Sequence, residues 1–134
     1  MLHWRVTSAA LVLLSLAPAA HSDITAPPGL GTAGWWVHPC TLFDRMVTSQ
    51  NQVSQDDLAQ AALCQGLFTG LISVNYVDPP YLPFCVGDDD SPIDYARIFL
   101  AFMRANPTYA DKKLRLVLLV ALGRAHPKER CAHG

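Results

Sequence analysis

The sequence has little charge, no paired cysteine motif and no long alternating pattern of the β-strand type. Only 16% of its 134 residues are charged, and none of its four cysteines lies in a Cys-x-x-Cys pair. A thioredoxin-like site, a c-type haem attachment and a zinc ribbon are therefore not expected. The nearly balanced charges also argue against a nucleic-acid partner and against binding to an anionic membrane surface.

The first 22 residues have the pattern of a secretory signal peptide. Arg5 gives a basic start, residues 9–20 form an apolar run, and small residues surround a cleavage site after Ser22. An uncleaved membrane anchor is the alternative, but spanning a bilayer takes about 20 apolar residues. We expect cleavage after Ser22, or after Ala19 or Ala20, and a soluble periplasmic protein with no membrane contact. Cleavage after Ser22 leaves 112 residues and a net charge of −2.

The remaining chain is expected to form a flexible arm at 23–39 and one all-α domain at 40–134. Three prolines and three glycines occur in the arm, a composition that does not sustain a helix. Trp35 and Trp36 follow in the same segment. Either they pack onto the domain as a lid, or they are exposed and anchor a partner.

Four helices are predicted from their start signals and apolar spacing. They cover about 41–49, 54–76 and 92–105, and a last helix begins with Asp111 as its cap and ends before Pro127. The third has the clearest start, with Ser91 as N-cap, Pro92 in the first turn and Asp94 three residues after the cap. Short connections favour antiparallel neighbours, so we predict a small four-helix bundle stapled by disulfides.

An even number of cysteines in a small exported domain indicates two disulfides, for which three pairings exist. In an antiparallel bundle, Cys40 at the start of the first helix and Cys85 after the second lie at the same end. Cys64 lies midway along the second helix, and Cys131 follows the fourth, where the chain can fold back. Cys40–Cys85 with Cys64–Cys131 is therefore the pairing ranked first.

A Cys-x-Gly segment in the second helix is interpreted as a helix-packing motif. It comprises Cys64, Gly66, Phe68 and Gly70. Gly66 and Gly70 share one helical face, where missing side chains would let another helix approach closely. Charged and amide residues precede the segment, so a membrane GxxxG contact is not expected. A phosphate cradle is not expected either, because it needs a loop leading into a helix N-terminus.

The loop after the second helix is the expected partner-binding surface. Its candidate contacts are Tyr76, Asp78, Tyr81, Asp88, Asp89 and Asp90. Prolines among them reduce the entropy lost on docking, and acids beside aromatics suit a cationic cleft on a partner. Alternatively, Tyr81 and Phe84 fill the end of the bundle and the acids form a solvated loop that charges the next helix N-terminus.

No catalytic, metal or cofactor site is expected. No nucleophile elbow surrounds a serine, and the acidic run lacks the spaced ligands and the glycine of an EF-hand loop. His38, His126 and His133 occur near cysteines in the sequence. Oxidised cysteines supply no thiolate ligands, however, and flexible histidines alone make a poor site.

Four short segments in a fixed order resemble the Tai immunity proteins. These segments are CQGLFTG, FCVG, ARIFLAFMRANP and LRLVLLVALGRAHPKERC, and they extend from about Cys64 to Cys131 within a resemblance that begins near Cys40. Tai proteins are periplasmic antidotes to peptidoglycan amidase effectors delivered by type VI secretion. The family usually has tyrosine at Leu67 and proline at Gly87. The resemblance implies a non-enzymatic protein that inhibits such an effector by stoichiometric binding.

A second interpretation comes from a different functional class. The layout also looks like the small acid-stress chaperones of the periplasm, which share a helical build tied by disulfides. Such chaperones use dense titrating charges, and this chain is only 16% charged. The sequence also allows a homodimer.

Overall fold

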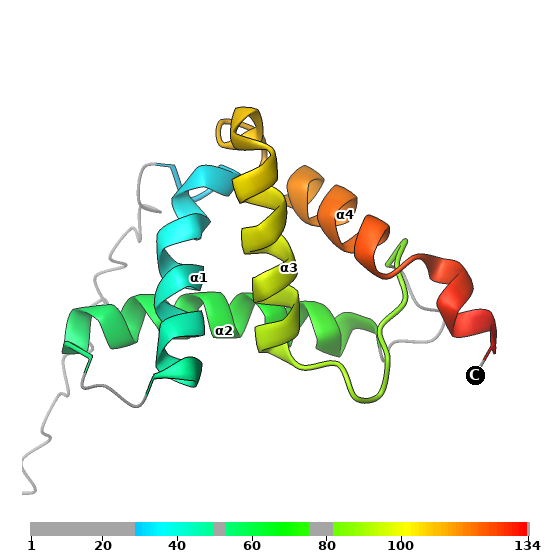
Figure 1. Cartoon of the computed structure of the whole chain (residues 1–134), viewed down its shortest axis with the longest axis horizontal. Helices are drawn as coiled ribbons and strands as arrows, with labels where there is room; N and C mark the ends of the chain where they lie inside the picture. Colours follow the sequence, from blue (N-terminus) through cyan, green and yellow to red (C-terminus); the bar gives the residue numbers. More distant parts are fainter. Residues whose placement is uncertain (1–28, 50–52, 76–81, 134) are drawn as a thin grey trace, which may run out of the picture.

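The described part of the chain is mainly helical, which confirms the predicted all-α class. The computed structural model describes residues 29–49, 53–75 and 82–133 (Figure 1). In these ranges there is no β-strand, and the α-helices are α1 (Ala33–Thr48), α2 (Gln55–Asn75), α3 (Pro92–Ala105) and α4 (Leu114–Ala125). The short 3-10 helices η1 (Pro107–Tyr109) and η2 (Lys128–His133) follow α3 and α4. The predicted signal peptide at 1–22 lies outside the described residues.

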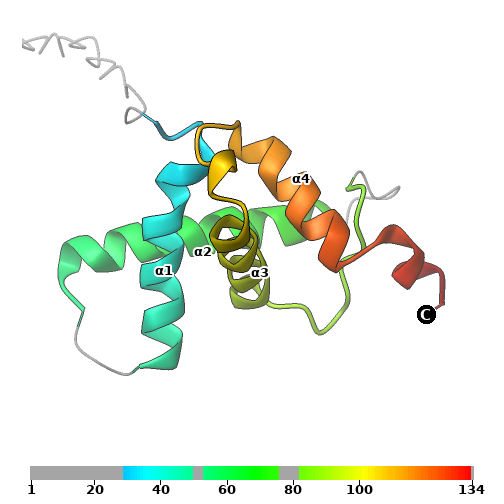
Figure 2. The same ribbon diagram turned by 45° about the horizontal axis from the view of Figure 1, so that its top comes forward.

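Three helices form the body of the molecule, and α2 crosses the other two. α1 and α3 lie side by side and run in opposite directions, while α2 passes behind both in each view (Figures 1 and 2). α4 packs beside α3 and leads away to η2 at the C-terminal end. The middle of α2, rather than one of its ends, therefore faces α1.

This crossing corrects the predicted disulfide pairing. The predicted bridges Cys40–Cys85 and Cys64–Cys131 are wrong, because Cys40 bonds Cys64 and Cys85 bonds Cys131. Their Cα atoms are 5.1 and 5.4 Å apart, respectively. Cys40 does not begin a helix, since α1 starts at Ala33 and places it in mid-helix opposite the middle of α2. The prediction assumed that α2 runs alongside the first helix, which would keep Cys64 away from Cys40.

The predicted flexible arm at 23–39 is also wrong from Ala33 onward. The first turn of α1 is held by the segment that joins η1 to α4: Ala33 N–H donates to the Lys112 carbonyl at 2.9 Å, and Gly34 N–H donates to the Ala110 carbonyl at 2.8 Å. Pro39 lies inside α1, where proline costs about 3 kcal/mol or more. The tertiary hydrogen bonds and the burial of α1 outweigh this local preference, which the composition alone does not reveal.

The two tryptophans pack on the domain rather than extending from it. Trp36 is buried, and its Nε1–H donates to the Leu30 carbonyl at 2.8 Å. Trp35 is half-buried and packs edge-on against Trp36, with ring centroids 5.2 Å apart. The interpretation of these residues as a lid is therefore confirmed for Trp36.

An aromatic group joins α2, α3 and the loop before α3 at the centre of the core. Phe68 of α2 lies 6.4 Å from both Tyr95 and Phe99 of α3, measured between ring centroids. Phe84 of the loop lies 6.3 Å from Tyr95. All four side chains are excluded from solvent, which confirms that Phe84 fills the interior.

The glycine motif does not act as predicted. Cys64 and Phe68 face the core, but Gly66 and Gly70 lie on the exposed side of α2, and a Cβ added at either one would meet no atom within 4 Å. Large apolar side chains, Leu63 among them, are about half exposed on this helix. By length and hydropathy, α2 could cross a membrane, and 17% of its most apolar window is buried in this structure.

The close approach predicted for Gly66 and Gly70 occurs instead at Gly34. A Cβ at Gly34 would lie 2.9 Å from the Ala110 carbonyl oxygen, so the backbone would have to shift. We expect Gly34→Ala to lower the free energy of unfolding by about 1–3 kcal/mol through overpacking. Gly66→Ala and Gly70→Ala should each raise it, by about 1 kcal/mol at most, through helix propensity. Urea unfolding of the three variants checks this; destabilisation by Gly70→Ala would restore the packing role.

The boundaries of the last two helices differ in how well they were predicted. α3 begins at Pro92 with Ser91 as N-cap, and the Ser91 N–H donates to the Asp94 carboxylate at 3.2 Å, as the capping box predicts. α4 begins at Leu114, so the expected cap at Asp111 is wrong. There the chain pairs with the segment before α1, where Leu114 N–H donates to the Gly31 carbonyl at 2.9 Å.

Candidate functional site

The described part of the predicted binding loop is an acidic turn on a fixed base. Residues 82–91 leave the core at Phe84 and return to it at the start of α3. Phe84 forms an antiparallel bridge with Pro127, and the Cys85 N–H donates to the His126 carbonyl at 2.9 Å. Because these contacts join the loop to the segment after α4, two distant parts of the chain form one surface.

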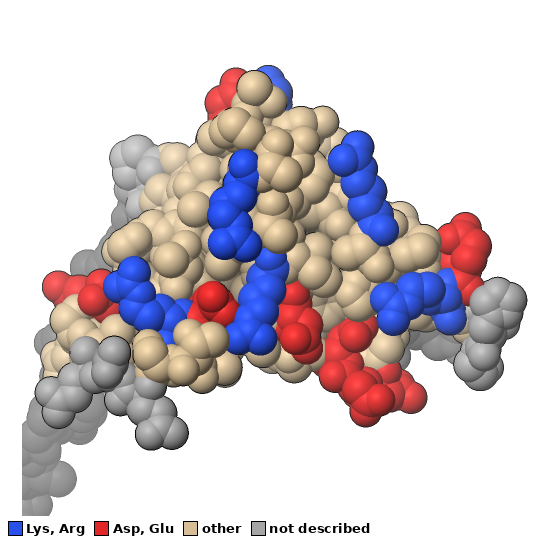
Figure 3. Space-filling view, viewed as in Figure 1, with Lys and Arg blue, Asp and Glu red and all other residues tan. Residues whose placement is uncertain are grey.

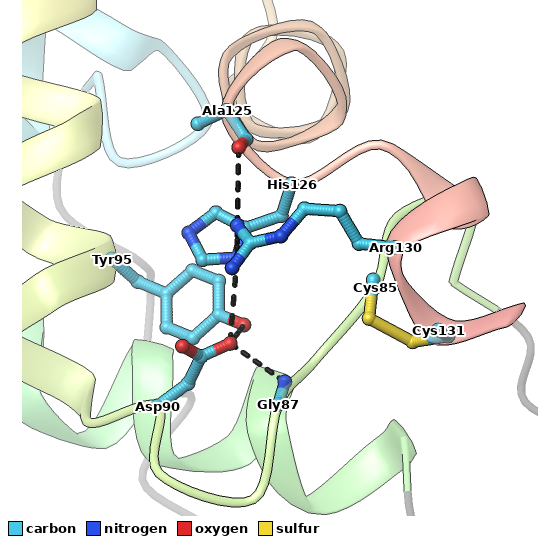
Figure 4. The surroundings of a disulfide bond; sticks show 8 residues. All are labelled: Cys85, Gly87, Asp90, Tyr95, Ala125, His126, Arg130 and Cys131. Carbon is cyan, nitrogen blue, oxygen red and sulfur yellow. Dashed lines mark hydrogen bonds and ion pairs between the residues drawn. A yellow bond between two sulfur atoms is a disulfide. The ribbon is translucent and has the colours of Figure 1, made fainter. Parts of the chain in front are cut away.

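The Cys85–Cys131 disulfide adds a covalent link at the same place. It joins the loop to η2 across a sequence separation of 46 residues (Figure 4). The other disulfide joins α1 to α2. The acidic turn is therefore anchored by a disulfide of its own.

Asp90 is the centre of a polar cluster beside this disulfide. Its Oδ2 accepts hydrogen bonds from the Gly87 N–H at 2.7 Å and from the Tyr95 hydroxyl at 2.8 Å (Figure 4). His126 Nδ1 lies 3.4 Å from the same oxygen, and Arg130 Nη1 lies 3.1 Å from His126 Nδ1. The side chains of Asp90 and His126 are 18% and 11% exposed, so the cluster is largely sheltered from water.

The surroundings of Asp90 favour its ionised form. Burial raises the pKa of Asp90, but the Gly87 and Tyr95 hydrogen bonds and the charges of His126 and Arg130 lower it further, to a value below the ordinary one. Burial, followed by the hydrogen bond to Asp90, raises the pKa of Tyr95 well above its usual value. At neutral pH, Asp90 is a carboxylate and Tyr95 a neutral donor, an arrangement that holds the turn shut.

Asp88 and Asp89 project from the turn into solvent. The Asp90 N–H donates to the Gly87 carbonyl at 3.1 Å, which closes the turn and leaves both intervening residues exposed. Neither carboxylate makes an ion pair within the described ranges. Acidic side chains gather at the lower right of the surface in Figure 3. Two adjacent negative charges are thus presented side by side from a fixed base.

The predicted site residues therefore divide into three groups. Tyr76, Asp78 and Tyr81 lie outside the described residues. Asp88 and Asp89 are free to contact a partner, whereas Asp90, predicted with them, is engaged inside the cluster.

The sequence did not indicate that three further residues belong to the site. Tyr95, His126 and Arg130 hold the turn, and only the buried histidine directly after the last helix gave a local signal. His126 was considered as a metal ligand together with Cys131, but Cys131 is in a disulfide. No group of three metal-ligating side chains occurs in the described part of the chain.

Known proteins offer no further guide to this site. Comparison of the chain with protein-family models, curated proteins and solved structures found no match. The functional argument therefore depends on the geometry of the turn, on the disulfides and on the sequence resemblance described above.

Proposed function

We propose that this protein is a periplasmic binding protein of the immunity type, which inhibits a peptidoglycan amidase effector of type VI secretion by stoichiometric contact. The observation that carries the proposal is the acidic turn, in which Asp88 and Asp89 are exposed on a base held by a disulfide and the Asp90 cluster. Neither carboxylate forms an ion pair with a residue that the structure describes. The resemblance of the sequence to the Tai proteins supports the choice of partner.

A rigid acidic turn suits inhibition by binding. A surface that is already ordered loses little conformational entropy when a partner docks, so more of the interaction energy appears as affinity. Two adjacent carboxylates attract a cationic cleft and speed the encounter, particularly at low salt. A positively charged rim around the effector's substrate cleft would therefore be the complementary surface.

The state of the cysteines supports export. Both pairs are oxidised, and the described structure has no free cysteine. Structural disulfides are typical of oxidising compartments such as the bacterial periplasm. Together with the proposed signal peptide, they favour action in the same compartment as cell-wall amidases.

The ionisable groups at the site favour binding over catalysis. Tyr95 donates its hydroxyl to Asp90, His126 lies beside the same carboxylate, and all three side chains are largely sheltered from water. A general base needs access to the proton that it removes. We therefore propose a non-enzymatic role.

The test is the double variant Asp88→Asn with Asp89→Asn. If an amidase effector is encoded beside this gene, loss of both charges should weaken the complex with it by about tenfold or more, mostly through slower association at low salt. Surface plasmon resonance at two salt concentrations measures this, and survival of cells that produce the effector in the periplasm gives the functional readout.

A matched control separates local recognition from net charge. Asp56→Asn with Asp57→Asn removes the same two charges from the start of α2, away from the turn. This control should leave affinity nearly unchanged. Equal weakening by both double variants would contradict recognition through the turn, and lysis despite good expression of the wild-type protein would reject the immunity role.

Exposed apolar side chains favour a second candidate, an envelope-stress chaperone. Large apolar residues are about half exposed on α2 and α4; they include Leu58, Leu63, Leu116 and Leu119. Such groups can hold an unfolded client by its own apolar segments. A light-scattering assay of client aggregation at low pH separates the candidates, because a dedicated inhibitor gives no protection there.

A further inference from the structure

A groove between α1 and α3 is a feature of the surface that the acidic turn does not explain. It has a volume of about 400 Å³ and lies toward the C-terminal half of α3, whereas the acidic turn precedes the N-terminus of that helix. Both helices face the viewer in Figures 1 and 3. A ligand in the groove would therefore not touch the acidic turn.

The lining of the groove is mainly apolar. Its apolar side chains are Val37 on α1, Leu100 and Met103 on α3, and Pro107 and Ala110 beyond α3. Thr41 also lines it, but its hydroxyl already donates to the Val37 carbonyl at 2.7 Å. An occupant therefore needs an apolar body and gains little from hydrogen bonding to this wall.

The charges that border the groove leave an excess of positive charge. Asp44 lines it, but its Oδ1 pairs with the Arg97 Nε at 2.7 Å. Arg104 lines it as well and has no carboxylate partner among the residues that the structure describes. Basic side chains are prominent on this face in Figure 3. The complementary ligand therefore carries one negative group.

We propose that this groove binds a small carboxylate amphiphile of the fatty-acid class, with its aliphatic chain on the apolar lining and its carboxylate at Arg104. The volume lies within the range of small-molecule sites, about 300–1,000 Å³. A cationic ligand is disfavoured because Asp44 is already neutralised by Arg97.

Calorimetric titration of the exported protein with three single-chain probes tests the chemistry. The probes are decanoate, decanol and decyltrimethylammonium, each used below its micelle-forming concentration. Decanoate should bind about tenfold more tightly than decanol, because only the carboxylate can make a charge-assisted hydrogen bond with Arg104. The cationic probe should bind most weakly. Equal affinity for all three probes would overturn the proposal.

Two pairs of variants test the location. Thr41→Phe fills the groove and should reduce decanoate affinity at least about tenfold. Thr48→Phe is its control, because Thr48 is exposed on the same helix, bonds its hydroxyl to a carbonyl in the same way and lies outside the groove. Arg104→Gln should weaken decanoate but not decanol, whereas Arg45→Gln should weaken neither. Thermal unfolding of each variant confirms that it folds.

The outcomes distinguish this site from a protein interface. Loss of decanoate binding in Thr41→Phe but not in Thr48→Phe supports the groove. Equal behaviour of these two variants places the ligand elsewhere and overturns the proposal. If decanoate does not bind the wild-type protein and Thr41→Phe disrupts the effector complex, the groove is a protein contact and the lipid proposal fails.

Discussion

Replacing Cys85 and Cys131 with alanine is expected to lower the free energy of unfolding by about 4 kcal/mol and to loosen the acidic turn. The estimate follows from the 46-residue separation that this disulfide closes, which restricts the unfolded chain. The bond also fastens η2 beside the loop, so its removal should release the C-terminal segment that carries Arg130. Urea unfolding gives the energy, and hydrogen exchange at Gly87 and Asp90 reports the loosening.

The Cys40–Cys64 pair provides the matched comparison. It closes a separation of 24 residues, so its replacement with alanine should cost about 3.5 kcal/mol. This variant should keep the slow exchange of the turn and, while folded, its affinity for the effector. Equal loosening of the turn in both double variants would show that the Cys85–Cys131 bond has no local role. Peptide mapping of the unreduced protein checks the pairing itself.

Asp90→Asn should have the second large effect, and its size should depend on pH. The variant loses the ionised acceptor shared by Gly87 and Tyr95, and hydrogen bonds to charged groups contribute about 1.5–3 kcal/mol each. An asparagine oxygen replaces part of this, so we expect a net loss of about 2 kcal/mol at pH 7. Asp89→Asn, one residue away and exposed, should change stability very little.

The sign of the pH dependence follows from the lowered pKa of Asp90. A carboxylate with a folded-state pKa below its unfolded value stabilises the protein fully above the unfolded value. That stability is lost as pH falls through the folded value. The stability difference between wild type and Asp90→Asn should thus shrink below about pH 4. A difference that did not shrink there would contradict this role of Asp90.

Sequence signals predicted a helix boundary correctly where the residues that form the boundary are close together in the chain. The Ser91, Pro92 and Asp94 start of α3 is correct because its capping groups lie within one turn of each other. The arm at 23–39 failed from Ala33 onward, because the donors of the first turn of α1 find acceptors at Ala110 and Lys112. Such partners are far away in sequence, and glycine and proline content gives no information about them.

The sequence also predicted only part of the candidate site. Asp88 and Asp89 are adjacent in sequence and lie in a turn, so their exposure could be inferred. Tyr95, five residues from Asp90, was not assigned to the site. His126 and Arg130 could not be assigned, because His126 meets Asp90 and Arg130 meets His126 only after α4 and η2 have packed beside the loop. Gly66 and Gly70 were correctly predicted to share one face of the helix. That face was expected to pack against another helix, but it points to solvent.

Composition and local patterning thus decided the helical class, the signals that start α3 and the acidity of the turn before it, because each depends on residues within a few positions of one another. The crossing of α2 behind α1 decided the disulfide pairing and which residues of α2 are exposed. It brought Cys40 to Cys64, left Cys85 to join Cys131, and turned Gly66 and Gly70 outward. The direction in which one helix crosses another is set by side-chain packing over the whole interface, which a reading along the chain does not contain.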